Sequence, residues 1–239
     1  MFQPSNLNIA SAMAHAGQCD PLECCGVIGT DGQYYPLKNT ATEFDTFVMD
    51  MAGYLEVVKQ TPAAAIVHSH VWLPPIPSDG DKAMCEKTGL PWLIISWPTG
   101  NWQVIHPNGF RAPLVGRKWA WGTHDCYGLI RDGMAEEAQI AIPDFPREWL
   151  WWKDGGDIIA KQFKQAGFHQ LPPGTPPKHC DVLGMRIRSK VVNHLGLFLD
   201  PDVILHQMMG QLSVREVYGG FLADATELHL RHSKLGGDG

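Results

Sequence analysis

The sequence lacks three features that mark special classes of protein: a long hydrophobic run, a basic run and a dense set of cysteines. No window approaches the roughly 20 uninterrupted apolar residues that a membrane span requires. The N-terminal segment has neither a cationic region nor a continuous apolar stretch, so we expect a soluble protein without an export signal. There are 19 Lys and Arg against 25 Asp and Glu, a net charge of -6, without a basic cluster that would neutralise several phosphates. We therefore exclude a nucleic-acid-binding protein.

Six cysteines in 239 residues are too few for a disulfide scaffold, and the adjacent pair Cys24 and Cys25 is unsuited to bridging itself. We expect reduced cysteines, each available as a core residue, a metal ligand or a nucleophile. The chain is 44% apolar and 18% charged, so it has enough hydrophobic material for cores and too little charge for a disordered chain. Its length fits two domains of about 100 to 150 residues.

The first half of the chain has patterns of both helices and strands. Apolar residues at helical spacing after Ser5 predict a helix that ends at Gly17. The Asp31-Gly32 pair predicts a hairpin turn between two short apolar runs. The predicted elements of this half are the helix from residue 7 to 16, strands over 24–29, 33–37, 63–67, 92–97 and 102–106, and helices over 51–60 and 78–89.

A polar stretch punctuated by Pro and Gly follows His106 and predicts a domain boundary. We place one domain at residues 1–108, a linker at 109–117 and a second domain at 118–239. Both domains are expected to have a mixed α/β (α+β) fold. The second half is predicted to contain helices over 126–138 and 157–166, a Trp-rich loop over 148–152, and strands over 181–187, 191–199 and 203–207.

Two histidines and an aspartate have the spacing of a metal site. His68 and His70 follow an apolar run, and residues two apart on a strand point to the same face, so both imidazoles can reach one ion. Asp81, in the first turn of the next predicted helix, would be the third ligand. Two His and one carboxylate leave a fourth position for water, as in catalytic zinc sites. We therefore predict zinc as the cofactor.

Two further residues complete a hydrolytic mechanism at this site. Glu23 would take the proton of the zinc-bound water and pass it to the leaving amine. Ser78 would donate a hydrogen bond to the developing oxyanion. Two alternatives remain open: Ser78 and Asp81 form only a helix capping box while the histidines are polar residues at a strand end, or the site is a degenerate copy without metal.

The P-x-E-x-C-G segment over 21–26 and the H-x-H-x7-S-x2-D pattern over 68–81 together resemble the JAMM (JAB/MPN-type) metallopeptidase family. Every signature position is filled, and the resemblance covers roughly residues 1–106. It implies a curved sheet with flanking helices, and a zinc peptidase that cuts a peptide or isopeptide bond.

A second set of residues predicts a thiol site. Cys126 begins a predicted helix, where the helix dipole and unpaired N–H groups favour a thiolate. If residues 200–202 form a three-residue hairpin loop, His206 lies opposite Gly196, and His194 and His206 are diagonal neighbours on one face. Cys126 would then attack a carbonyl, His194 would take its proton and later protonate the leaving amine, and His206 would orient His194.

The D-C-x-x-L segment at 125–129, the histidine strand with L-G-L, and a polar residue twelve positions on resemble the NlpC-type cell-wall cysteine peptidases over roughly residues 117–210. The resemblance implies a papain-like helix packed on an antiparallel sheet, and a γ-D-glutamyl–diamino acid bond of peptidoglycan as substrate. The chain departs from the family at Cys180, which replaces the glycine of a G-D-V segment. The alternative is that Cys126 is a buried small hydrophobic residue and that 11 histidines produce coincidental pairs.

The order of the two domains resembles the tail tip assembly proteins of lambdoid siphophages. This resemblance implies other tail tip proteins as partners, synthesis in the host cytoplasm, and local hydrolysis of the host wall during DNA entry. Two rival hypotheses remain: a structural tail component with vestigial sites, and a bacterial wall-remodelling peptidase unrelated to phage.

Overall fold

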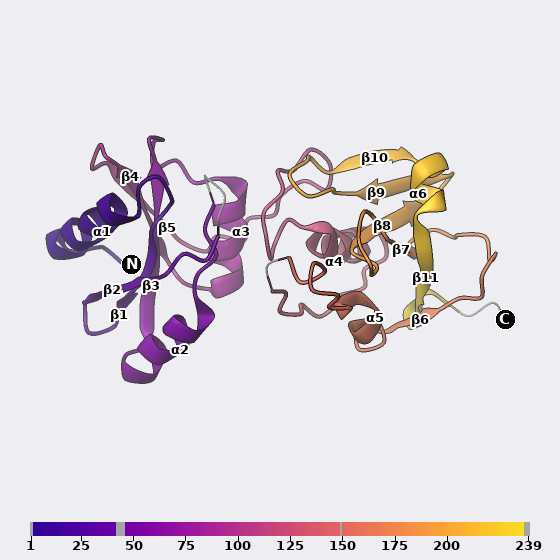
Figure 1. The fold of residues 1–239 in the computed structure, drawn as a ribbon, viewed down its shortest axis with the longest axis horizontal. Helices are drawn as coiled ribbons and strands as arrows, with labels where there is room; N and C mark the ends of the chain where they lie inside the picture. The colour runs from indigo at the N-terminus through magenta and orange to yellow at the C-terminus, as the bar shows by residue number, and fades with distance from the viewer. Residues whose placement is uncertain (1, 42–45, 149, 237–239) are drawn as a thin grey trace. The chain divides into compact units, whose positions relative to one another are not determined.

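The computed structural model describes residues 2–41, 46–148 and 150–236. The chain divides into two compact units, Met1–Arg111 and Ala112–Gly239 (Figure 1). Each unit combines a sheet with helices, so the predicted two-domain, mixed fold class is confirmed. In the parts of the chain that are described, no helix is both long and apolar enough to cross a membrane.

The first unit is built on a sheet in the order β2-β1-β3-β4-β5. Strands β3 and β4 are parallel to each other, and the remaining pairs are antiparallel. The central strands β1 and β3 are mostly buried, whereas β2 at the edge is largely accessible and contains Pro36, which has no N–H to pair. The strands are β1 (Cys25–Gly29), β2 (Tyr34–Leu37), β3 (Ala63–Val71), β4 (Trp92–Trp97) and β5 (Trp102–Ile105).

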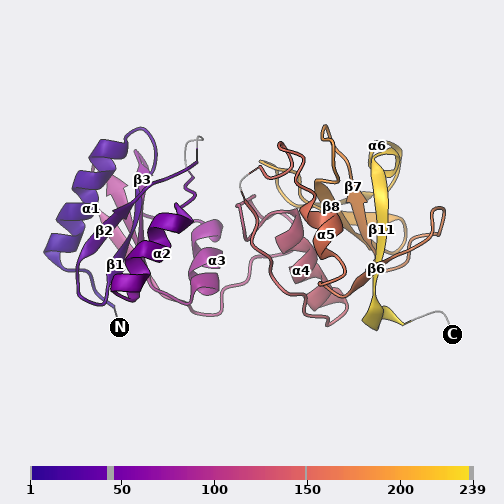
Figure 2. The same cartoon turned by 60° about the horizontal axis from the view of Figure 1, so that its bottom comes forward.

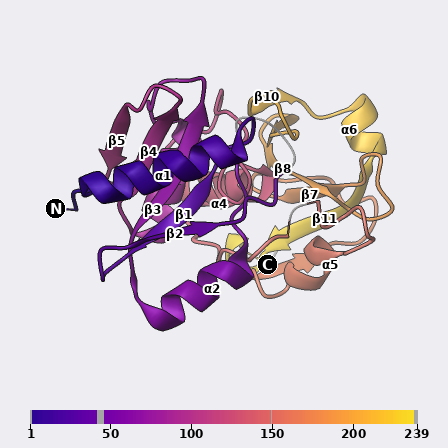
Figure 3. The same ribbon diagram turned by 60° about the vertical axis from the view of Figure 1, so that its left-hand side comes forward.

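Helices cover both faces of this sheet (Figures 1 and 2). Helix α1 (Asn6–Cys19) packs on one face, where it runs across β3 and β4 (Figure 3). Helices α2 (Met51–Gln60) and α3 (Asp79–Thr88) contribute to the core on the other face. Because alternate residues of a strand face opposite sides, β3 directs Ala65 and Val67 toward α1, and His68 and His70 toward the side of α3.

The first half of the chain differs from its prediction at two places. Helix α1 does not end at Gly17 but continues to Cys19. Gly17 is instead a packing position, because a Cβ there would lie 2.8 Å from Trp97 Cη2. Strand β3 continues past the predicted 63–67 to Val71, so both histidines lie on a strand, as their predicted common face requires. The hairpin, α2 and β4 lie where the sequence predicts them.

The second unit contains an antiparallel sheet in the order β10-β9-β8-β7-β11-β6. Helix α4 (Cys126–Glu137) packs mainly on β8 and also contacts β9. Gly196 pairs with His206 across β8 and β9, which confirms the predicted three-residue hairpin loop. The other elements are β6 (Phe168–Gln170), β7 (Val182–Met185), β8 (His194–Leu199), β9 (Val203–His206), β10 (Val214–Val217), β11 (Thr226–His232), α5 (Ile158–Gln162), α6 (Gly220–Asp224) and the 3-10 helix η1 (Ser233–Leu235).

The sequence analysis missed strands β6 and β10 and the position of β11 between β7 and β6. Strand β6 has three residues and β10 has four exposed ones, so neither carries a clear alternation of buried and exposed side chains. Helix α5 is shorter than the predicted helix over 157–166. Residue 149 of the predicted Trp-rich loop lies outside the described residues.

Candidate functional sites

Two imidazoles and one carboxylate form a buried cluster in the first unit. His68 Nε2 lies 3.1 Å from Asp81 Oδ1, and His70 Nε2 lies 3.5 Å from Asp81 Oδ2. The two Nε2 atoms are 3.2 Å apart. One ligand atom from each of the three residues falls within 4.8 Å of the others. The structure therefore brings the three predicted metal ligands together.

The start of α3 holds Asp81 in place. Ser78 is the N-cap: its Oγ accepts a hydrogen bond from Asp81 N at 3.1 Å, while Ser78 N and Oγ both donate to Asp81 Oδ2 at 2.7 Å. This is a complete capping box, so that alternative is correct as a description of the local structure. The same carboxylate also faces the two histidines, so the box orients Asp81 toward them. The role of Ser78 as an oxyanion donor stays a prediction.

The histidine rings are held from outside the cluster. His70 Nδ1 lies 2.9 Å from the carbonyl oxygen of Pro74. Because a carbonyl oxygen only accepts, His70 Nδ1 carries a proton, and Nε2 is the nitrogen that faces Asp81 and His68. The ring of His68 stacks on Phe47 at 4.9 Å between centroids and meets Trp92 edge-on at 5.4 Å. Within the described residues, no hydrogen bond reaches the buried His68 Nδ1.

Glu23 lies beside this cluster and is 5% exposed. Cys25 pairs with His68 in the antiparallel ladder between β1 and β3, so the residue two before Cys25 comes beside the residue two after His68, which is His70. Burial lowers the pKa of His70, but the hydrogen bond with Asp81, the Pro74 carbonyl and the charges of Asp81 and Glu23 outweigh it and raise that pKa. Glu23 is thus close enough to act electrostatically on a candidate ligand.

The histidines and Ser78 stabilise the charged form of Asp81. Burial alone would raise the pKa of Asp81, but the charge and hydrogen bond of His68, with hydrogen bonds from His70 and Ser78, hold it well below its usual range. Two imidazole nitrogens and a carboxylate oxygen are the donor set that zinc prefers. The two Nε2 atoms would repel each other through their lone pairs if neither a proton nor a cation lay between them. The residues therefore fit a zinc ion.

In the second unit, Cys126 is the first residue of α4. Asp125 is the N-cap, and its Oδ1 accepts a hydrogen bond from Gly128 N at 2.8 Å. Gly128 is required here because a Cβ would lie 1.6 Å from the carbonyl oxygen of Thr123. The local sequence thus fixes the position of the thiol at the start of the helix.

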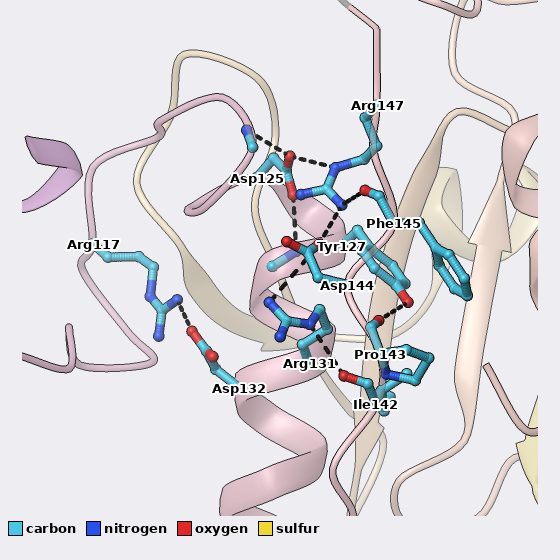
Figure 4. Close-up of polar contacts among 12 residues, drawn as sticks. Arg117, Asp125, Tyr127, Arg131, Asp132, Ile142, Pro143, Asp144, Phe145 and Arg147 are labelled. Atoms are coloured by element: carbon cyan, nitrogen blue, oxygen red, sulfur yellow. Dashed lines mark hydrogen bonds and ion pairs between the residues drawn. The ribbon is translucent and has the colours of Figure 1, made fainter. Parts of the chain in front are cut away.

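Arg147 supports this turn from a distant segment (Figure 4). Its Nε donates to Asp125 Oδ2 at 2.9 Å, and its Nη1 donates to Asp144 Oδ1 at 2.9 Å. The guanidinium also lies over the ring of Tyr127, 5.0 Å from the centroid. Both side chains of the Asp125–Arg147 pair are buried. Sequence reasoning missed Arg147 because the segment around it has no regular secondary structure and no motif.

The two predicted histidines meet as expected from the register of β8 and β9. His194 Nε2 lies 2.9 Å from His206 Nδ1, with the rings nearly perpendicular at 75°. His206 Nε2 lies 2.5 Å from Glu216 Oε1 on β10. The sequence analysis missed Glu216. A prediction of β10 as the partner of β9 would have identified it, because Glu216 is a diagonal neighbour of His206.

The surroundings of Cys126 and His194 favour the neutral form of each side chain. Burial raises the pKa of Cys126 to about 12, the charge of Asp125 adds to this, and the Leu195 backbone and the charge of Arg147 only partly oppose it. These contributions favour the protonated thiol, against the thiolate expected from the helix start. Burial, aided by the neighbouring His206, lowers the pKa of His194 to about 3.

Cys126 and His194 line one cavity of about 540 Å³. The sulfur of Cys126 also interacts with the backbone of Leu195, the residue that follows His194. Tryptophans form part of the wall: the ring centroids of Trp121 and Trp152 are 6.3 Å apart, and those of Trp119 and Trp121 are 6.0 Å apart. The structure therefore places the predicted nucleophile and base in a cavity of the size that holds a small ligand.

Cys180, the position that departs from the expected glycine, has φ = 66°. This is the left-handed region in which glycine is favoured, so the turn has the conformation that glycine adopts readily. The next residue, Asp181, is anchored by two hydrogen bonds from Arg231, at 2.8 and 2.7 Å, and by His229 at 2.7 Å. The substitution therefore leaves this turn in a glycine-like conformation.

Comparison with known families assigns one family to each unit. Residues 8–107 match the family of prokaryotic homologs of the JAB domain. Residues 116–231 match the NlpC/P60 family. The first unit also resembles a solved JAB1/MPN domain protein from Archaeoglobus fulgidus, with 18% identity over 47% of this chain and 95% of that chain and a TM-score of 0.31. Because this score is low, the assignment of the first unit rests on the family match.

Two curated relatives span most of the chain. A tail tip assembly protein K of Escherichia phage N15 is 32% identical over 236 residues, covering 96% of each chain. A tail tip assembly protein K of Escherichia phage lambda is 32% identical over 170 residues, covering 71% of this chain and 82% of that protein. Both the sequence similarity and the order of the two domains agree with the resemblance seen in the sequence.

Proposed function

The chain belongs to the tail tip assembly protein K family, and we propose that it is a tail tip protein with two separate hydrolytic sites. The C-terminal unit hydrolyses peptide bonds in the stem peptides of peptidoglycan through the thiol of Cys126. The N-terminal unit binds zinc and hydrolyses a peptide or isopeptide bond. The protein is made in the host cytoplasm, assembles with other tail tip proteins and acts at the host cell wall.

The observation that supports the thiol reaction best is the shared cavity of Cys126 and His194, with His194 already hydrogen-bonded to His206. His194 Nε2 is engaged by His206, so Nδ1 is the nitrogen that takes the thiol proton. The sulfur forms a bond to the scissile carbonyl carbon, and the C–N bond breaks as His194 returns the proton to the leaving amine. Water then hydrolyses the thioester and regenerates the thiol.

The neutral resting pair makes this a general-base reaction. His194 has to become an imidazolium only while the sulfur attacks, so charge develops inside the site rather than being present beforehand. The backbone N–H of Cys126, at the start of α4, would stabilise the negative oxygen of the tetrahedral intermediate. The tryptophan-lined cavity gives the substrate a partly apolar wall to pack against.

In the N-terminal unit, His68, His70 and Asp81 would hold the zinc ion. A bound zinc ion polarises the scissile carbonyl and makes a nucleophile available at neutral pH. Glu23, buried beside His70, would accept a proton at its carboxylate and deliver it to the leaving amine. Ser78 keeps Asp81 turned toward the histidines through the capping box.

Digestion of purified peptidoglycan tests the thiol reaction. Wild-type protein should release cleaved stem peptides, detected by mass spectrometry, and Cys126→Ala should release none. Cys19→Ala, which removes a half-buried thiol of α1, is the matched control and should leave the release unchanged. Equal release by wild type and Cys126→Ala would refute the thiol assignment, and no release by either would favour a structural tail component.

Elemental analysis tests the metal assignment. The purified protein should contain about one zinc per chain, and the double substitution His68→Ala and His70→Ala should remove it. His15→Ala, in α1 of the same unit, should keep the zinc. An unchanged zinc content in the double variant would remove these residues from the site.

A further inference from the structure

A glutamate on the edge strand of the second sheet extends the histidine pair of the thiol site. His206 is 3% exposed and uses both ring nitrogens: Nδ1 faces His194 Nε2 at 2.9 Å, and Nε2 faces Glu216 Oε1 at 2.5 Å. The three side chains come from the adjacent strands β8, β9 and β10. They therefore form a continuous hydrogen-bonded row that ends at a carboxylate.

This row fixes where the ring protons lie. A carboxylate oxygen accepts hydrogen bonds, so the proton between His206 and Glu216 sits on His206 Nε2. In a neutral imidazole the other nitrogen is then an acceptor, so His206 Nδ1 receives the proton of His194 Nε2. His194 Nδ1 is consequently the nitrogen with the lone pair. One carboxylate thus determines the tautomer of two rings.

The carboxylate of Glu216 would also stabilise a positive charge on the histidine pair. As His194 takes the proton of Cys126, the pair of buried rings gains a positive charge. Asp125, the other carboxylate near the thiol, is already paired with Arg147. Among the described residues, Glu216 is the carboxylate in contact with this histidine pair, and its negative charge stabilises the imidazolium.

We propose that Glu216 is a positioning residue of the thiol site: acting through His206, it sets the tautomer that leaves His194 Nδ1 available to accept the Cys126 proton. This inference rests on the proposed cysteine peptidase function. Glu216 is not among the residues that line the cavity of Cys126 and His194, and its side chain is 51% exposed at the sheet edge. Its effect should therefore fall on the chemical step rather than on substrate binding.

Kinetics with soluble peptidoglycan peptides provide the first test. Glu216→Ala should lower kcat by about tenfold to a hundredfold and change KM by less than about twofold, because the reactive tautomer is no longer enforced. Glu216→Gln should give an intermediate kcat, because its amide oxygen can still accept from His206 Nε2. Glu227→Ala removes a partly exposed glutamate of β11 in the same sheet and should leave kcat unchanged.

The tautomers themselves provide a second test that needs no substrate. With 15N-labelled histidine, NMR of the wild type should show His206 and His194 protonated at Nε2, whereas Glu216→Ala should show a mixture of tautomers. An unchanged tautomer pattern in Glu216→Ala would overturn the inference, whatever happens to kcat. A wild type that cleaves no peptidoglycan peptide would refute the proposed function, and the NMR result would still decide the role of Glu216.

Discussion

The two sites differ in how the chain assembles them and in how they carry charge. The candidate metal ligands lie within residues 68–81, on one strand and the first turn of the next helix, whereas the candidate thiol site joins residues from 126 to 216. The first site is ionic: the pKa of Asp81 is depressed and that of His70 is raised. The second is neutral, with the pKa of Cys126 raised and that of His194 lowered. One strand and the helix start after it gather the candidate ligands, whereas His194, His206 and Glu216 come from three adjacent strands of a sheet.

The largest expected effect on stability comes from Asp125, which caps α4 next to Cys126 and pairs with Arg147. Asp125→Ala should lower the unfolding free energy of the second unit by about 4 to 6 kcal/mol, because it removes an N-cap and leaves the buried Arg147 without this partner. The first unit should be unaffected. Hydrogen exchange of backbone amides, followed separately in α4 and β3, measures both effects.

Asp157→Ala is the matched control, because Asp157 caps α5 through Ala160 N in the same unit. It should cost only about 1 kcal/mol. Equal losses from the two substitutions would show that the pair of Asp125 with Arg147 adds nothing to the cap.

Acid should lower the stability of the second unit, because it protonates His194 when the chain unfolds. The pKa of His194 is about 3 in the folded chain, below its usual value near 6.5, so the neutral ring stabilises the fold above pH 6.5. This contribution is lost as the pH falls from about 6.5 toward 3 and amounts to something on the order of 4 kcal/mol. Denaturant unfolding of the second unit at pH 7, 5.5 and 4.5 measures it.

His194→Gln should flatten this pH dependence, whereas His179→Gln, at a more exposed histidine of the same unit, should retain it. A wild type with equal stability of the second unit at pH 7 and 4.5 would contradict the neutral, buried state of His194.

The smallest expected effects come from removing the two serines that cap helices in the first unit. Ser5 and Ser78 both cap a helix with a complete box, but only Ser78 contacts a candidate ligand. Ser5→Ala and Ser78→Ala should each lower the unfolding free energy by about 1 kcal/mol. Only Ser78→Ala should also weaken zinc binding, by about tenfold to a hundredfold, in titrations against a competing chelator. Equal zinc affinity of the two variants would mean that the box does not orient Asp81.

Local signals made most of the metal site predictable from the sequence. Ser5 and Ser78 mark helix starts, Asp31-Gly32 marks a hairpin, and the spacing of the histidines fixes their common face. The packing role of Gly17 was not predictable, because the Trp97 ring that packs on it belongs to the distant β4.

Only the part of the thiol site that depends on the pairing of β8 with β9 could be predicted from the sequence. A three-residue loop sets the pairing of β8 with β9 and therefore the meeting of His194 with His206. Glu216 was missed because the short, exposed β10 has no hydrophobic alternation. The raised pKa of Cys126 was also not predictable, because the helix start is visible in the sequence and the packing around the thiol is not.

Peptidoglycan digestion by wild type, Cys126→Ala and Glu23→Gln in parallel tests the independence of the two sites most directly. We expect Cys126→Ala to stop the release of stem peptides and Glu23→Gln to release them at the rate of the wild type. Loss of release in Glu23→Gln, or full release in Cys126→Ala, would contradict the assignment of wall hydrolysis to the thiol alone.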